Sequence, residues 1–267
     1  MSNGVNGSTS NGNAVAPGRW DHDQQVLPVR NQETAGDSPG HARQVSGSRN
    51  RATARLDCCS RIATWNVNTL YQVGKLENLK KEAERMKLDV VGVSEVRWTG
   101  SGQITSGSWT LYYSGGETHD AGVGVLLRKE VAEAVVGCWQ VSERVILVKI
   151  DAKPIPLNII QVYAPTGDHS DDEDDDFYEQ VDSVRSRCKP GEVILVMGDL
   201  NAKVGKGRSG NVVGNFGLGE RNERGDKWVE WCESWDQVIM NTFFRHHPRH
   251  LYTWKSPGDS EEPNRLL

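Results

Sequence analysis

The sequence predicts an α/β fold in which stacked β-sheets are flanked by helices. From Ser60 onward, many short apolar segments alternate with only two or three helical patterns, which does not fit strict β–α–β alternation. The chain has 267 residues, of which 36% are hydrophobic and 28 are glycine. This composition is close to that of ordinary globular proteins, so the chain can bury a sizeable core.

The composition also excludes several classes of protein. The net charge of −5, from 31 Lys and Arg against 36 Asp and Glu, argues against a strongly basic nucleic-acid-binding protein but not against a nucleic-acid enzyme. No apolar run approaches the roughly 18 residues needed to span a bilayer, and the Asn- and Gly-rich start has no apolar signal region. The five cysteines lack CxxC spacing, so we expect reduced thiols. We therefore expect a nuclear or cytoplasmic protein that is neither secreted nor membrane-bound.

Two segments of the chain differ in composition. Residues 1–57 are rich in Gly, Asn, Ser, Pro, Gln and Arg, and apolar residues occur there only singly. Such a segment cannot bury enough apolar surface to offset its ordering entropy, so we expect it to be disordered. One folded domain is expected over 58–267.

The first half of this domain is predicted to consist of strands and one helix. The apolar segment 61–67 predicts a strand, and the pattern after it places Leu76, Leu79 and Ala83 on one face of a helix. Runs of β-branched and aromatic residues then predict strands at 89–93, 109–113, 122–127, 145–150 and 157–163.

The second half is predicted to contain two more helices and the most apolar strand. A helix over 172–187 carries Phe177, Val181 and Val184 on one face, and its first half is a run of acids, which the helix dipole favours there. The remaining predicted elements are a strand at 192–197, a Gly-rich loop over 198–219, a helix over 225–235, and short strands at 238–241 and 251–254.

Three of the predicted strands end abruptly in polar side chains, Asn66, Glu95 and Asp199. Apolar strands hold such tips rigidly at the rim of a sheet, and Mg²⁺ takes one or two carboxylates together with waters and phosphate oxygens. Glu95 is the best ligand candidate, with Asn66 beside it, and Asp199 is the best general acid or base. Tyr163 ends another strand, where its hydroxyl could bond a phosphate oxygen. Each residue alone is more often a turn, cap or packing residue, so the inference depends on the whole set.

The ordered motifs also carry a family resemblance. They are ATWNVN at 63–68, SE at 94–95, VYAP at 162–165 and GDLN at 198–201. This series resembles the endonuclease/exonuclease/phosphatase superfamily, which includes abasic-site endonucleases, pancreatic-type DNases, inositol phosphatases and sphingomyelinases. Three further motifs resemble the endonuclease domains of RTE-type non-LTR retrotransposons: SEVRWTG at 94–100, GLGERN at 217–222 and LYTW at 251–254. The resemblance implies a four-layer α/β sandwich of two packed mixed β-sheets with helices outside.

The resemblance implies a metal-binding role for the first two motifs. Glu95 would hold Mg²⁺ or Mn²⁺, and Asn66 would contribute directly or through water. Asn68 would lie near the metal and the phosphate.

The later motifs would act on the phosphate itself. Tyr163 would orient the scissile phosphate, and Asn201 would stabilise its charge. Asp199 would position or deprotonate the attacking water, or protonate the leaving group. The implied reaction is metal-assisted hydrolysis of DNA at abasic or target sites, by a protein that we expect to be a monomer.

The end of the sequence departs from the family pattern. Relatives carry an Asp in a strand that follows the Tyr-Thr-Trp block and a Ser-Asp-His triplet near the end of the domain. After Trp254 this sequence has neither that strand with its Asp nor the triplet. We therefore expect a C-terminally truncated domain with an open sheet edge and weak or absent hydrolysis, since loss of a proton-managing pair typically costs about 10²–10⁴-fold. The alternative is a catalytically inactive, retrotransposon-derived remnant that acts at most as a binding module. A phospholipid or inositol phosphate substrate is a third possibility, which no apolar lid in the sequence supports.

Overall fold

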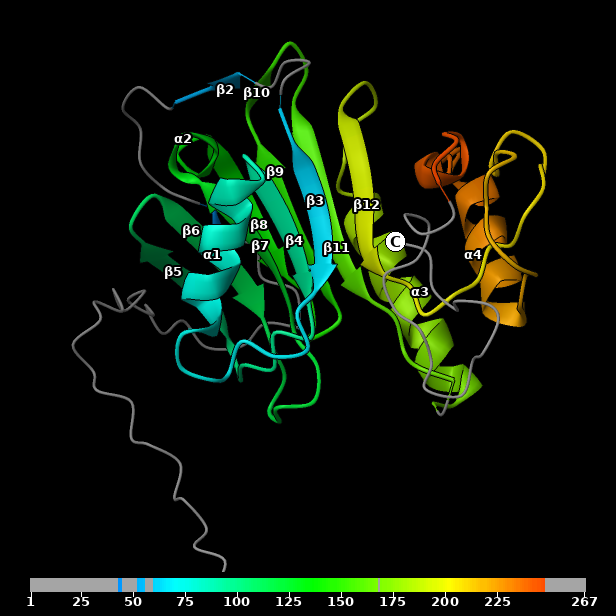
Figure 1. Cartoon of the computed structure of the whole chain (residues 1–267), viewed down its shortest axis with the longest axis horizontal. Coiled ribbons are helices and arrows are strands. Elements are labelled where there is room, and N and C mark those ends of the chain that lie inside the picture. Colours follow the sequence, from blue (N-terminus) through cyan, green and yellow to red (C-terminus); the bar gives the residue numbers. More distant parts are fainter. Residues whose placement is uncertain (1–42, 45–51, 56–59, 168, 248–267) are drawn as a thin grey trace, which may run out of the picture. The chain divides into compact units, whose positions relative to one another are not determined.

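Two five-stranded sheets pack face to face in the computed structural model, which describes residues 43–44, 52–55, 60–167 and 169–247 (Figure 1). The first sheet has the strand order β3-β4-β7-β6-β5, and the second has the order β1-β8-β9-β11-β12. A small third sheet pairs β10 with β2.

The strands and helices have the following bounds. The first sheet consists of β3 (Ile62–Asn66), β4 (Val90–Ser94), β5 (Ser101–Ser106), β6 (Trp109–Ser114) and β7 (Val123–Arg128). The second consists of β1 (Arg43–Gln44), β8 (Val135–Gln140), β9 (Val145–Ile150), β11 (Leu157–Tyr163) and β12 (Val193–Asp199). The small sheet contains β2 (Ala54–Arg55) and β10 (Ala152–Lys153). The helices are α1 (Lys75–Arg85), α2 (Lys129–Ala132), α3 (Asp171–Arg185) and α4 (Glu223–Ser234), followed by a short 3₁₀ helix over Met240–Thr242.

Strand β4 shows how the side chains divide between the layers. Val90 packs in the cluster between the two sheets, whereas Val91 and Val93 pack with Leu79 and Ala83 of α1. Successive side chains of a strand point to opposite faces, so one strand serves both clusters. Helix α1 therefore covers the outer face of the first sheet.

Helices α3 and α4 cover the outer face of the second sheet. Ile160 of β11 belongs to the same apolar cluster as Phe177 of α3 and residues of α4. The two helices are also joined by Asp182, whose Oδ1 accepts hydrogen bonds from Nε1 of Trp231 at 2.7 Å and of Trp235 at 2.6 Å. The layers thus run helix, sheet, sheet, helices, and the predicted sandwich of packed mixed sheets flanked by helices is confirmed.

One polar contact crosses the apolar space between the sheets. Gln161 of β11 is 0% exposed, and its Nε2 donates to Ser94 Oγ on β4 at 3.0 Å. Ser94 Oγ donates in turn to the carbonyl oxygen of Val162 at 3.0 Å. Gly92 leaves room for Gln161, because a Cβ at Gly92 would lie 1.8 Å from Gln161 Oε1. A buried polar side chain needs its partner, so this contact favours one alignment of the sheets.

The two parallel strand pairs place their ends at one rim. β3 runs parallel to β4 with Asn66 opposite Ser94, and β11 runs parallel to β12 with Tyr163 opposite Asp199. Parallel neighbours finish at the same edge of a sheet. Since β12 also contacts β3 and β4 of the other sheet, the four carboxyl ends lie close together.

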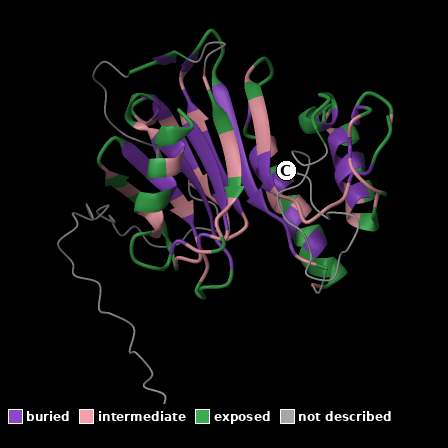
Figure 2. Cartoon of the chain, viewed as in Figure 1, coloured by how far each residue is buried: buried purple, intermediate pink, exposed green. Residues whose placement is uncertain are grey.

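Burial is concentrated in the sheets and on the inner sides of the helices (Figure 2). Edge strands are more exposed: Trp65 of β3 is 40% exposed, Val193 of β12 is 46% exposed, and β5 has no buried residue. Within the described ranges, no strand pairs with the outer edge of β3 or β12. None of the helices in this part of the chain is both long enough and apolar enough to cross a membrane.

The three predicted helices and most predicted strands are present, with ends that differ by a few residues. The strand predicted at 238–241 is wrong. Ile239 forms only an isolated bridge with Val213, and the chain then turns into the 3₁₀ helix. Buried Thr242 stabilises that turn, because its hydroxyl accepts from Gly214 N and donates to Ile239 O, both at 2.7 Å. The sequence analysis also missed β5, β8 and α2.

Two short strands lie inside the segment 1–57 that we predicted to be disordered. β1 pairs with β8, and β2 pairs with β10. Ala54 is 5% exposed, and its N–H donates to Asp151 O at 2.9 Å. The rest of that segment, the strand predicted at 251–254 and the end of the chain lie outside the described residues.

Gly198 provides a test of the close packing between β11 and β12. Its φ is 145°, and a Cβ there would lie 1.9 Å from Val162 O. We expect Gly198→Ala to lower the free energy of unfolding by at least about 2 kcal/mol, because both the backbone strain and the clash fall on the folded state. Urea unfolding measures the change. Gly167→Ala is the matched control, since a Cβ there meets no atom within 4 Å, and an equal loss in both variants would contradict the explanation.

Candidate active site

Asn66, Tyr163 and Asp199 converge because each faces inward at the end of its strand. Asn66 lies two positions after Thr64, which contacts Gln161 between the sheets. Tyr163 likewise lies two positions after Gln161, and it belongs to the cluster between the sheets. The period of two along a strand therefore points these tips toward the other sheet. Asp199 ends β12 opposite Tyr163 and completes the group.

The side-chain amide of Asn66 joins two carboxylates. Its Nδ2 donates to Glu95 Oε1 at 2.7 Å and to Asp199 Oδ2 at 3.0 Å. Its Oδ1 accepts from the backbone N–H of Asn68 at 3.0 Å. These bonds connect the two sheets at the rim and place both carboxylates within reach of one group.

Glu95 has two further partners. Arg97 Nη2 donates to Glu95 Oε2 at 2.8 Å, and Tyr163 Oη donates to Glu95 Oε1 at 3.2 Å. Burial by itself raises the pKa of Glu95, but the bonds from Asn66, Arg97 and Tyr163, with the Arg97 charge, lower that pKa below its usual value. Glu95 is therefore held as a carboxylate.

The pKa of Tyr163 is shifted upward, so its side chain stays a neutral phenol. Burial, then the charge of Glu95 and the bond to it, and then the charge of Asp199 raise the pKa of Tyr163 to about 12. The guanidinium of Arg144 lies 5.5 Å from the centre of the Tyr163 ring and moderates this shift. The hydroxyl of Tyr163 is thus a hydrogen-bond donor over the whole neutral range.

Asn201 lies beside Asp199 and has an unused acceptor. Its backbone N–H donates to Asp199 Oδ1 at 3.1 Å, and its Nδ2 donates to Ala164 O at 2.7 Å. Its Oδ1 is buried and has no hydrogen-bond partner among the described residues. Amide oxygen and nitrogen are assigned from the network, and the short bond to a carbonyl requires Nδ2 on that side. A buried acceptor without a partner is a position for a ligand atom.

Asn68 lies beside this network without a side-chain bond to it. Its side chain is exposed, and its contribution is the backbone N–H that binds Asn66. The structure thus brings Asn66, Glu95, Tyr163, Asp199 and Asn201 together, with Asn68 at the margin.

The backbone around the rim is strained. Non-glycine residues with positive φ occur at Asn68 (49°), Thr69 (121°), Glu95 (57°), Arg97 (57°) and Asn201 (47°). Such conformations cost about 1–3 kcal/mol each and cluster at functional sites. They aim Glu95 and Asn201 in directions that the preceding strands would not supply.

The oxygen atoms of this group fit a hard divalent cation. Two carboxylates share one amide donor, and Mg²⁺ needs only one or two carboxylates with waters and phosphate oxygens. The described ranges contain no group of three or more His, Cys, Asp and Glu residues that could hold a metal ion. A Mg²⁺ site with one or two carboxylates does not need such a group.

Sequence reasoning did not find three residues near the site. Arg97 pairs with Glu95, Arg144 lies over Tyr163, and His119 Nδ1 donates to Arg97 O at 2.7 Å. Arg97 belongs to the SEVRWTG motif, so the sequence could have indicated that this residue lies near the site. Arg144 and His119 lie in loops with no pattern that would mark them.

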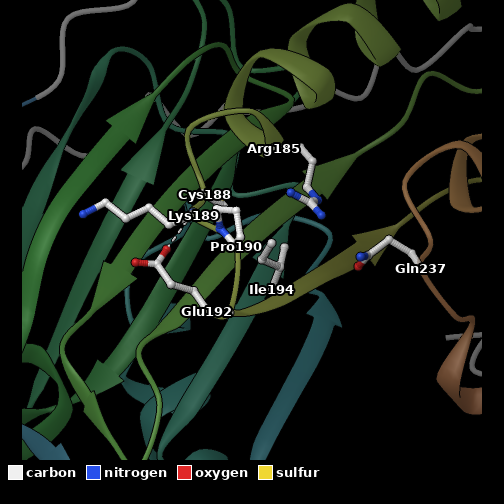
Figure 3. Close-up of a pocket in the computed structure, with 8 residues that line it drawn as sticks. Arg185, Cys188, Lys189, Pro190, Glu192, Ile194 and Gln237 are labelled. Atoms are coloured by element: carbon white, nitrogen blue, oxygen red, sulfur yellow. Dashed lines mark hydrogen bonds between the residues drawn. The ribbon is translucent and has the colours of Figure 1, made fainter.

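A cavity of about 290 Å³ lies elsewhere in the fold (Figure 3). Its lining includes Arg185, Cys188, Glu192, Ile194 and Gln237. Ile194 lies near the start of β12 and Asp199 at its end, about 16 Å away at the usual rise of a strand. The cavity is therefore separate from the candidate site.

The sequence comparisons identify the family. Residues 63–266 match the endonuclease/exonuclease/phosphatase family, so the chain belongs to that family. Craniofacial development protein 2 from Bos taurus is 39% identical over 208 residues, which correspond to 76% of this chain and 35% of that protein. The sequence motifs predict similarity to proteins of this name, and the comparison confirms it. The chain spans about a third of the length of this relative.

Two solved structures have a similar fold. AP endonuclease LMAP from Leishmania major has a TM-score of 0.52 at 12% identity, over 74% of this chain and 73% of that chain. The catalytic domain of APE2 from Xenopus laevis has a TM-score of 0.51 at 13% identity, over 74% of this chain and 76% of that chain. At these identities the likeness shows the fold alone.

The amide bridge leads to a prediction about stability. We expect Asn66→Ala, studied with EDTA, to lower the free energy of unfolding by about 1–3 kcal/mol at pH 7, because two nearby carboxylates lose a shared donor. The pKa of Glu95 is lower in the folded protein than in the unfolded chain. The ionised carboxylate therefore stabilises the fold at a pH above the unfolded pKa, and this stabilisation is lost as the pH falls through the folded pKa. The destabilisation caused by Asn66→Ala should therefore become smaller as the pH falls below about 4.

Urea titrations across this pH range measure the effect. Asn215→Ala is the control, since Asn215 is exposed. A pH-independent loss in Asn66→Ala would show that the carboxylates are not the reason for it.

Proposed function

We propose that this chain is a divalent-metal-dependent endonuclease that hydrolyses phosphodiester bonds of DNA. The single observation that carries the proposal is the group in which Asn66 joins Glu95 and Asp199 across two sheets. Membership of the endonuclease/exonuclease/phosphatase family supports the reaction class. Since a fold alone does not determine function, the proposal depends on these side chains.

Glu95 is the proposed ligand of Mg²⁺ or Mn²⁺, and Asn66, whose Oδ1 also accepts from the N–H of Asn68, would contribute directly or through water. When bound, the cation would neutralise charge on the phosphate. The low pKa of Glu95 keeps it ionised and ready to bind a cation at neutral pH. Arg97 positions Glu95 through the 2.8 Å bond to its second oxygen.

The other residues act on the phosphate and on water. Tyr163 stays protonated and donates its O–H to a phosphate oxygen. Asp199 accepts the proton of the attacking water, and hydrogen bonds from Asn66 and from the N–H of Asn201 hold its carboxylate in place. The buried Oδ1 of Asn201 accepts a hydrogen bond from a water or a substrate group. Preorganised donors of this kind cost no rearrangement during the reaction.

The remaining features of the proposal follow from the sequence motifs. We propose that the domain derives from an RTE-type retrotransposon endonuclease, acts on DNA as a monomer and works in the nucleus or cytoplasm. Loss of hydrolysis with retention of DNA binding is the alternative function, as expected for a retrotransposon-derived remnant.

A plasmid-nicking assay tests the reaction. We expect Mg²⁺-dependent nicking that EDTA abolishes and that Asp199→Asn reduces at least about 100-fold, because the water loses its proton acceptor. Asp176→Asn is the control, since Asp176 is an exposed carboxylate on α3. Nicking that survives in Asp199→Asn would contradict the mechanism. A wild-type rate equal to that of an intact AP endonuclease would contradict the expected impairment, and DNA binding without nicking would favour the alternative.

A thermal-shift experiment tests the metal site without reference to activity. We expect Mg²⁺ to raise the melting temperature of the wild type, since a cation present at about 100 times its Kd stabilises by about 2.7 kcal/mol. Glu95→Gln should remove most of this shift, because the carboxylate is the principal ligand. The exposed Glu133→Gln should keep the shift. Equal shifts in all three proteins would place the cation elsewhere.

A further inference from the structure

Two aromatic side chains lie beside the candidate site and have no part in the mechanism above. The ring centres of Tyr71 and His119 are 4.5 Å apart, with an interplanar angle of 52°. Both residues are exposed, Tyr71 to 42%. Because both rings are exposed, the pair is not part of the core, and its flat faces are open to solvent.

Hydrogen bonds connect this pair to Glu95. His119 Nδ1 donates to the carbonyl oxygen of Arg97 at 2.7 Å, and Arg97 Nη2 donates to Glu95 at 2.8 Å. On the other side, Leu70 N donates to Val96 O at 2.9 Å, so the loop that carries Tyr71 is joined to the loop that carries Glu95. The aromatic pair is thus two hydrogen bonds away from a carboxylate of the site.

The backbone holds Tyr71 in place through a strained turn. Thr69 has a φ of 121°, a rare conformation for a β-branched residue, and its Oγ1 accepts from Tyr71 N at 3.0 Å. Strain of this kind persists only where the surroundings enforce it. The turn thereby fixes the direction in which Tyr71 leaves the chain.

Arg97 adds an unsatisfied donor next to the pair. Its Nε is buried and has no hydrogen-bond partner among the described residues, while its side chain as a whole is 39% exposed. A phosphate cannot reach the buried Nε, but the positive charge of this partly exposed guanidinium attracts phosphate. An exposed aromatic pair and a cation together are the chemistry that recognises nucleotides.

We propose that Tyr71 and His119 form a stacking platform for an unpaired nucleobase next to the phosphate bound at Glu95. This inference rests on the proposed function and specifies its substrate as nucleic acid with an unstacked base at the cleavage site. Paired bases in a duplex already stack on their neighbours, so their faces are not available to the platform. An unpaired base exposes the face that an aromatic ring contacts.

Binding of two labelled DNA probes tests the platform. Fluorescence anisotropy in EDTA, which prevents cleavage, compares a short single strand with a blunt duplex of two fully complementary strands. We expect Tyr71→Ala to weaken binding of the single strand about 5- to 100-fold, the cost of losing one base–aromatic stack, and to change duplex binding less than about twofold. His119→Ala should act in the same direction. Tyr71→Trp should restore binding, because an indole offers a larger ring.

The matched control is Phe244→Ala, because Phe244 is an aromatic residue that is 55% exposed and lies after the 3₁₀ helix. The inference is overturned if Tyr71→Ala weakens both probes equally, changes neither, or acts no more strongly than Phe244→Ala. It is also overturned if the melting temperature of Tyr71→Ala falls and Tyr71→Trp fails to restore binding, which would show a purely structural role.

The two proposals can fail separately. Binding that depends on Tyr71, in a protein that never nicks DNA, would defeat the proposed function and leave the platform intact. Nicking that depends on Asp199, with binding that does not depend on Tyr71, would defeat only the platform.

Discussion

Gln161 lies fully buried between the two sheets and donates to Ser94 across the gap. Apolar packing around it is non-directional and would tolerate small slips of one sheet over the other. A buried amide that must keep its partners Ser94 and Thr64 at hydrogen-bond distance tolerates them much less. Tyr163 and Asn66 lie just beyond this contact on the same inner faces, so every distance at the rim depends on the alignment that Gln161 favours. Gly92 is part of the same constraint, because any larger residue would occupy the space of the Gln161 side chain.

The sequence predicted the sheets and the site to the extent that both follow from strand periodicity. Asn66, Tyr163 and Asp199 end apolar strands, and sheet geometry alone brings such ends to one rim. The predicted strand at 238–241 failed because a four-residue apolar pattern does not reveal the turn that Thr242 closes. β5 was missed because its side chains alternate between exposed and half-buried without a clear apolar face. Arg144 and His119 could not be predicted, since their contacts depend on how long loops return to the rim.

Charge at the rim is balanced locally and is unrelated to the net charge of −5. The carboxylates of Glu95 and Asp199 lie close to the guanidinium groups of Arg97 and Arg144. Much of the acidic excess lies in the first turns of α3, where Asp174 is buried and pairs with Arg224 at 3.4 Å and Lys227 at 3.0 Å. Asp174 and Asp175 join α3 to α4 in this way, at a distance from the candidate site along the fold. An acidic protein can therefore present a balanced surface to a polyanion.

The hydrogen bond between Asn66 and Asp199 joins residues 133 positions apart. A contact between residues so far apart in the sequence forms only after much of the chain is ordered. The entropy cost of closing the long loop must be met before the contact can stabilise the fold. Neither sheet can assemble the group alone, since Asn66 and Glu95 belong to one and Tyr163 and Asp199 to the other. A nascent or partly unfolded chain therefore lacks the assembled group, which forms only once the two sheets have packed together.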